Sequence, residues 1–211
     1  MVTEAARTAS ASAAARHIAR VAARLFAAQG YDATPVRAIV EAAGVTKPTL
    51  YYHFGSKEGL ARALLTVPMT GLIETLNGVA AAAGDPVVVL RQTFEVHFAF
   101  CREEPDRARF YYALCLGPHG ASAMAAELMR LSARLDAQVL DVVRGLAAGH
   151  VIPAGRVADC AKALRGLIVT STMDFLFRGE ELGPDLAERL VGDLLWGFGV
   201  PGPAGRGCDD G

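Results

Sequence analysis

Apolar residues recur at intervals of three and four positions along much of the chain, which is the period of an amphipathic α-helix. In the segment that ends at Gln29, one apolar face is formed by Ile18, Val21, Ala22, Leu25 and Phe26. Gly30 predicts the end of this helix, because a glycine just past the last turn adopts a left-handed conformation at low cost. No segment shows the strict alternation of a half-buried strand. The pattern therefore predicts an all-α protein of about nine helices.

Two short helices are expected next. Thr34 followed by Pro35 has the form of an N-cap and a first helical residue, and predicts a helix from about Pro35 to Ala43 that ends at Gly44. Thr46 is a second capping residue, and it predicts a helix over about Lys47–Phe54, with proline in the first turn. Two short helices separated by a Gly-Val-Thr turn fit a helix-turn-helix.

The remaining helices are longer. Ser56 caps a fourth helix that extends past Leu65 and is kinked or interrupted at Pro68. Further helices are predicted over residues 84–104, 105–117, 121–148, 156–178 and 184–198. This order predicts a flexible arm at 1–12, a three-helix DNA-binding head at 13–60, a helical body at 61–199 for ligand binding and dimerisation, and a flexible tail at 200–211.

The charge of the chain is unevenly distributed. The formal net charge is −1, but residues 1–60 hold seven Lys and Arg against four Asp and Glu. A mildly basic head on an acidic body points to a polyanion as partner of the head. The four cysteines contain no C-x-x-C pair, and neither a secretory segment nor an apolar run of about 18 residues is evident. We therefore expect a cytoplasmic protein without a membrane partner.

The third predicted helix carries unusually many hydrogen-bonding side chains. Lys47, Thr49, Tyr51, Tyr52 and His53 all lie within it, and Lys57 follows at the start of the next helix. A helix this short cannot bury two tyrosines and a histidine, so some must face outward, where they can reach phosphates and base edges. Packing inside the head is the alternative for Tyr51 and His53, and a solvated surface charge is the alternative for both lysines.

Residues 16–60 resemble the DNA-binding domain of the TetR family, which includes the tetracycline repressor. The matching segments are LFAAQGYDAT and IVEAAGVTKPTLYYHFGSKEGL, and residues 16–60, which contain them, are about a fifth of the chain. The resemblance implies a ligand-responsive transcriptional regulator, a repressor rather than an activator by the family's common mode, which a small molecule releases from a near-palindromic operator. It implies DNA contacts from Thr34, Arg37, Thr46, Lys47, Thr49, Tyr51, Tyr52, His53 and Lys57. In these, Lys47, Thr49 and Tyr51 would face the major groove.

For the body, the resemblance implies an effector cavity in the middle helices and a homodimer through the last two long helices, about 156–178 and 184–198. Candidate lining residues are Phe94, His97, Phe98, Cys101, Tyr111, Tyr112, Met124 and Met173. For each of them ordinary core packing is the alternative. Closure of the subunit's own core is likewise the alternative for the last helices.

Two other classes of protein fit the sequence less well. An enzyme is not expected, because no G-x-S-x-G, phosphate loop or paired acid motif is present. A helical interaction module without DNA binding would not need the polar third helix. No cofactor and no metal is expected, since His97 and Cys101 are only two potential ligands, four positions apart.

Overall fold

The computed structural model describes residues 4–82, 84–116 and 123–198. Within these ranges all regular structure is helical, which confirms the all-α fold class. The α-helices are α1 (Glu4–Gln29), α2 (Val36–Ala43), α3 (Lys47–Phe54), α4 (Lys57–Leu64), α5 (Thr66–Ala82), α6 (Pro86–Glu103), α7 (Pro105–Leu116), α8 (Ala123–Ala148), α9 (Val157–Arg178) and α10 (Leu186–Phe198). A single 3-10 turn, η1 (Ala154–Arg156), precedes α9.

The described residues thus form ten α-helices where about nine were expected, because the segment predicted as one kinked helix is two. The break falls at Leu65, and Pro68 lies in the first turn of α5, where a missing N–H costs little. Helix α1 begins at Glu4, inside the predicted arm of residues 1–12. The predicted tail, residues 200–211, lies outside the described residues, as do residues 1–3.

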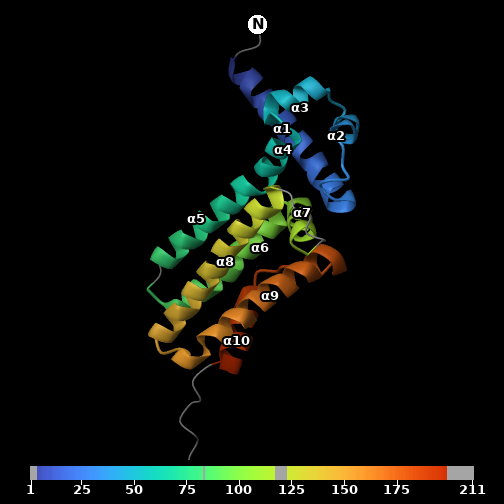
Figure 1. The fold of residues 1–211 in the computed structure, drawn as a ribbon. Helices are drawn as coiled ribbons and strands as arrows, with labels where there is room; N and C mark the ends of the chain where they lie inside the picture. Colours follow the sequence, from blue (N-terminus) through green and yellow to red (C-terminus); the bar gives the residue numbers. More distant parts are fainter. Residues whose placement is uncertain (1–3, 83, 117–122, 199–211) are drawn as a thin grey trace, which may run out of the picture.

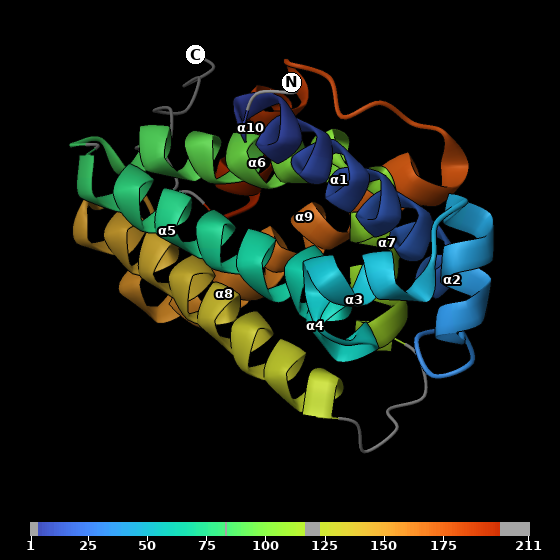
Figure 2. The same cartoon turned by 90° about the horizontal axis from the view of Figure 1, so that it is seen from above.

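Helices α1 to α4 gather at one end of the molecule, and α5, α6, α8, α9 and α10 form a longer bundle beside them (Figure 1). Seen from above, α7 lies next to α1 at the junction of these two parts (Figure 2). We call the first four helices the head and the rest the body; the division at residue 60 stays a prediction.

The head and the body share apolar core at this junction. Ile39 and Leu50, from the two short helices, are fully buried in one cluster with Phe26 of α1. Phe110 of α7 belongs to the same cluster, and its ring centroid lies 4.9 Å from that of Phe26. Since side chains of the interior pack densely, a shift of α7 must be felt by α1 and the head.

One segment, Lys57–Ala82, is long and apolar enough to cross a membrane by length and composition, although no apolar run of this length was expected. It comprises α4 and α5 and is broken at Leu65. Some of its apolar side chains, including Leu60, Met69 and Ile73, are buried against other helices, whereas Val67 is 67% exposed. A core helix meets the same criterion, so this finding is weak evidence for a membrane span.

Candidate functional site

The turn between α2 and α3 is built from local signals in the sequence. Gly44 ends α2 with φ of +63°, a left-handed conformation that glycine adopts without strain. Thr46 caps α3, and its hydroxyl accepts a hydrogen bond from the Thr49 N–H at 3.4 Å. Leu50 points inward and is fully buried, which fixes the rotation of α3 about its axis.

This rotation leaves the polar side chains of α3 on the outside. Tyr52 is 81% exposed and Tyr51 44% exposed, and Lys47 is also exposed. Thr49 and His53 are half-buried, and the His53 ring contacts Tyr52 edge-on at a centroid distance of 5.1 Å. A basic and aromatic helical surface with hydroxyl groups can bind phosphates and base edges.

Two predicted DNA contacts already have partners within the head. The exposed Arg37 guanidinium pairs with Glu41 at 2.6 Å, one turn along α2. The Lys57 ammonium donates to the Asp32 carbonyl at 3.4 Å and lies 4.4 Å from the centre of the Tyr31 ring. Partial burial lowers the pKa of Lys57. To bind DNA, Arg37 and Lys57 would have to leave these contacts within the head.

The prediction that Thr34 caps the second helix is wrong. Helix α2 begins at Val36, its N-cap is Pro35, and no side chain caps it. Thr34 is fully buried, and its hydroxyl donates to the Gly30 carbonyl at 2.7 Å. The threonine closes the turn after α1 instead of presenting its hydroxyl to solvent, so we do not propose it as a DNA contact.

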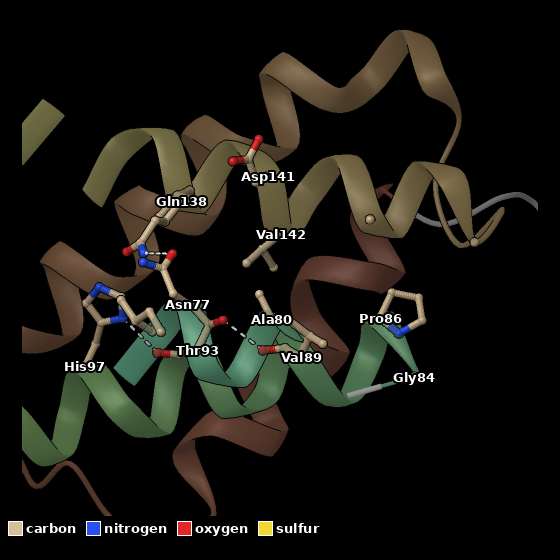
Figure 3. A pocket seen from close by; sticks show the side chains of 14 residues that line it. Asn77, Ala80, Gly84, Pro86, Val89, Thr93, His97, Gln138, Asp141 and Val142 are labelled. Atoms are coloured by element: carbon tan, nitrogen blue, oxygen red, sulfur yellow. Dashed lines mark hydrogen bonds between the residues drawn. The ribbon is translucent and has the colours of Figure 1, made fainter. Parts of the chain in front are cut away.

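The body contains a cavity of about 360 Å³ between α5, α6 and α8 (Figure 3), which we call the large cavity to distinguish it from a neighbouring cavity of about 100 Å³. Its walls are mostly apolar. Polar side chains gather on neighbouring turns, with Asn77 from α5, Thr93 and His97 from α6, and Gln138 from α8. An apolar cleft with a few fixed polar groups is the usual form of a small-molecule site.

A smaller cavity of about 100 Å³ lies on the other side of His97, between α5, α6, α7, α8 and α9. Cys101, Tyr111 and Tyr112 line it, and His97 lines both cavities. The Tyr111 hydroxyl is 3.0 Å from that of Ser132. Burial raises the pKa of both tyrosines, and raises that of the Cys101 thiol to about 11. These groups are therefore neutral near pH 7 and can offer hydrogen bonds but no charge.

The eight residues predicted to line an effector cavity do not all meet. His97, Cys101, Tyr111 and Tyr112 come together at the smaller cavity. Phe94 and Phe98 are instead buried in the core of the body, with ring centroids 5.8 Å apart. These two phenylalanines therefore belong to the hydrophobic core and do not line a cavity.

The two methionines lie elsewhere. Met124 is buried in the cluster that joins the head to α7, and Met173 lies at a surface hollow between α1, α7 and α9. Sequence reasoning missed Asn77 and Gln138, because no spacing in the sequence shows that α5 and α8 are neighbours. Among the described residues no three His, Cys, Asp or Glu side chains are placed to hold a metal ion.

The stability of the fold should depend on the protonation of His97. Burial lowers its pKa, against an opposing hydrogen bond to the Thr93 carbonyl. Below the unfolded-state value of about 6.5, the unfolded chain therefore binds the proton more readily than the folded protein does. We expect thermal unfolding to occur at lower temperature at pH 5.5 than at pH 7.5.

In the variant His97→Gln, the melting temperature should decrease less between pH 7.5 and pH 5.5 than in the parent. The control His150→Gln, at an exposed histidine, should show the same decrease as the parent. The measurement is the melting temperature of the three proteins at both pH values. An identical decrease in the parent and in His97→Gln would show that His97 does not cause the pH dependence of stability.

Comparison with known families gives a match over the head. The sequence model described as "Bacterial regulatory proteins, tetR family" matches residues 18–64. The HTH-type transcriptional regulator AcrR of Shigella flexneri is 38% identical over 78 residues, which are 36% of this chain and 36% of AcrR. The similarity to this relative thus spans about a third of its length.

Solved structures share the whole fold. The ketosteroid transcriptional regulator KstR2 of Mycobacterium tuberculosis matches with a TM-score of 0.72 and 20% identity, over 89% of this chain and 95% of that one. AibR, solved in complex with isovaleryl coenzyme A and operator DNA, matches with a TM-score of 0.64 and 18% identity, over 89% and 99%. At this level of identity, the likeness concerns the arrangement of the helices.

Proposed function

Because the chain belongs to the tetR family of bacterial regulatory proteins, we propose that it is a cytoplasmic homodimeric repressor, without enzymatic activity, that a small molecule releases from a near-palindromic operator. The observation that carries this proposal is the outer surface of α3. Exposed Lys47, Tyr51 and Tyr52 stand on a helix whose inner side is fixed by the buried Leu50. A core this rigid holds the surface in one orientation, as a helix that enters the major groove requires.

The position of each side chain supports a division of roles. Lys47, Thr49 and Tyr51 of α3 are assigned to base edges in the major groove. Tyr52 and His53 are assigned to phosphates, with Thr46 at the N-cap of α3 as a further contact. Arg37 and Lys57 complete the phosphate contacts from the flanking helices once they leave Glu41 and the Asp32 carbonyl.

The dimer is assigned to the outward faces of α9 and α10. Leu164, Ile168 and Leu194 lie on the apolar sides of these two helices and are buried within the subunit's own core. Trp196 is 94% exposed on the other side of α10. A tryptophan left this exposed in one subunit is well suited to be buried by a twofold contact, in which the same surface serves both partners.

The cavities of the body supply a place for an effector, and two contacts connect the body to the head. Arg62 of α4 forms an ion pair with Glu127 of α8 at 3.1 Å. The contact between the tilted rings of Phe26 and Phe110 connects α1 to α7. An effector that moves α8 or α7 would thereby change the spacing of the two heads. It does so only if it binds the spread form more tightly than the DNA-bound form.

The test uses a duplex from the region upstream of the gene, with a scrambled duplex of equal length as control. We expect binding of the upstream duplex, as measured by fluorescence anisotropy, to weaken at least tenfold between 50 and 200 mM salt, since phosphate contacts release counterions. Sedimentation of the complex should give two subunits on a site whose halves lie about 34–36 Å apart, or somewhat further. Equal binding of both duplexes, or a single subunit on the DNA, would refute the proposal.

A further inference from the structure

The amide of Gln138 has a defined orientation in the large cavity. Its nitrogen lies 2.9 Å from the Ile73 carbonyl oxygen and 2.6 Å from the Asn77 side-chain oxygen. A backbone carbonyl only accepts hydrogen bonds, so the atom facing Ile73 must be the donating nitrogen. The other end of the amide is then fixed as the oxygen.

This oxygen is a buried acceptor without a partner. Gln138 Oε1 is one of two buried side-chain atoms in the described residues that lack a hydrogen bond. An unsatisfied buried polar atom is unfavourable by about 1–3 kcal/mol, and such atoms often mark the place of a bound molecule. The amide lies at the same end of the cavity as the His97 ring (Figure 3).

The neighbouring histidine also offers an acceptor. His97 Nδ1 lies 2.7 Å from the Thr93 carbonyl oxygen, which fixes the ring proton on Nδ1. With burial lowering the pKa of His97, the ring is neutral near pH 7, and Nε2 carries a lone pair. The Thr93 hydroxyl, in turn, donates to the Val89 carbonyl at 2.8 Å. This end of the cavity therefore suits a ligand that donates a hydrogen bond.

The charges around the cavity restrict the ligand further. None of the described residues that line it is a lysine or an arginine. Its one carboxylate, that of Asp141, is exposed and paired with Arg144 at 2.9 Å. A carboxylate or phosphate placed at Gln138 would lose its hydration without gaining a cation, and an ammonium would find only a carboxylate that is already paired with Arg144.

We propose that the effector is an uncharged, mainly apolar molecule with a hydroxyl group, and that this hydroxyl donates to Gln138 Oε1 beside His97 in the large cavity. The inference rests on the proposed function, in which the body binds an effector. A volume of about 360 Å³ suits a small molecule of this kind.

The test compares three probes with one carbon skeleton, namely decan-1-ol, decylamine and decanoate. Their affinities for the DNA-free full-length protein are measured by titration calorimetry. Decan-1-ol should bind at least tenfold more tightly than either charged probe. No binding of decan-1-ol, or binding of decanoate or decylamine with equal or greater affinity, would overturn the proposal.

Variants locate the contact. Gln138→Met keeps the shape of the side chain but removes the acceptor, so the preference for decan-1-ol should decrease about tenfold. Gln138→Lys should reverse the preference toward decanoate, whereas the same change at Gln92, which lies on α6 outside the cavity, should not. Unchanged selectivity in folded Gln138→Met and Gln138→Lys would refute a contact at this residue.

A separate measurement with the upstream duplex distinguishes the two proposals. If decan-1-ol binds as expected but no duplex is bound specifically, the proposed function fails and the ligand class stands. If the duplex is bound specifically but the protein prefers decanoate, only the ligand class fails.

Discussion

Replacing Tyr52 by alanine is expected to weaken operator binding about tenfold to a hundredfold while leaving the melting temperature of the protein unchanged. Tyr52 is 81% exposed and its ring contacts only the neighbouring His53 in the described aromatic pairs, so its removal opens no cavity. A hydrogen bond from its hydroxyl to a charged phosphate would contribute about 1.5–3 kcal/mol, which corresponds to that loss. Anisotropy with the upstream duplex and thermal unfolding are the two measurements.

Two controls make this prediction specific. Tyr52→Phe removes only the hydroxyl and should lose most of the same affinity, for specific and scrambled duplexes alike, because a phosphate contact carries no sequence information. Met129→Ala, at a half-exposed apolar residue of α8, should bind as the parent does. If Tyr52→Ala binds the upstream duplex with parental affinity and is folded, the outer surface of α3 is not the DNA contact.

Gly59→Ala is expected to destabilise the fold by about 3 kcal/mol. Operator binding should then be lost at the lower temperature at which this variant unfolds. A Cβ at this position would lie 2.0 Å from the Phe54 carbonyl oxygen, which belongs to the last turn of α3. Because this neighbour is backbone, α3 or α4 must shift, and overpacking of this kind typically costs 1–3 kcal/mol or more. For a protein of this size the melting temperature should fall by roughly 6–12 °C.

Gly78→Ala is the matched control, since Gly78 lies within helix α5 and a Cβ there would meet nothing within 4 Å. Alanine has a higher helix propensity than glycine, so this change should raise stability by up to about 1 kcal/mol. Equal melting temperatures for Gly59→Ala and the parent would show that the corner between α3 and α4 accommodates a side chain.

The head was largely predictable because its signals are local. Gly44, Thr46 and Ser56 each act on their own turn of backbone, and the bounds of α3 follow from the last two together with Gly55. The inward position of Leu50 follows from the helical period. Thr34 shows the limit of this reasoning. A threonine before a proline is typical of a helix N-cap, but in the folded chain its hydroxyl donates to the Gly30 carbonyl instead.

The body was predictable as helices but not as a site. An apolar stripe shows that a helix is buried on one side, and it does not show which helix covers it. Leu164, Ile168 and Leu194 therefore suited a dimer contact equally well, and only the packing of α9 and α10 placed them in the subunit's own core. In the same way, Phe94 and Phe98 were candidates for a cavity that their own burial excludes.

Local patterns of residues were enough to predict the all-α fold, the helix-turn-helix and the polar side chains of α3, because each depends on contacts within a few residues. Only the tertiary structure placed Gln138 against Ile73, 65 positions earlier in the chain, and left its oxygen without a partner beside His97. Such a site depends on how α5, α6 and α8 pack together. The hydrophobic effect that drives this packing is not directional, so no local pattern of residues specifies it.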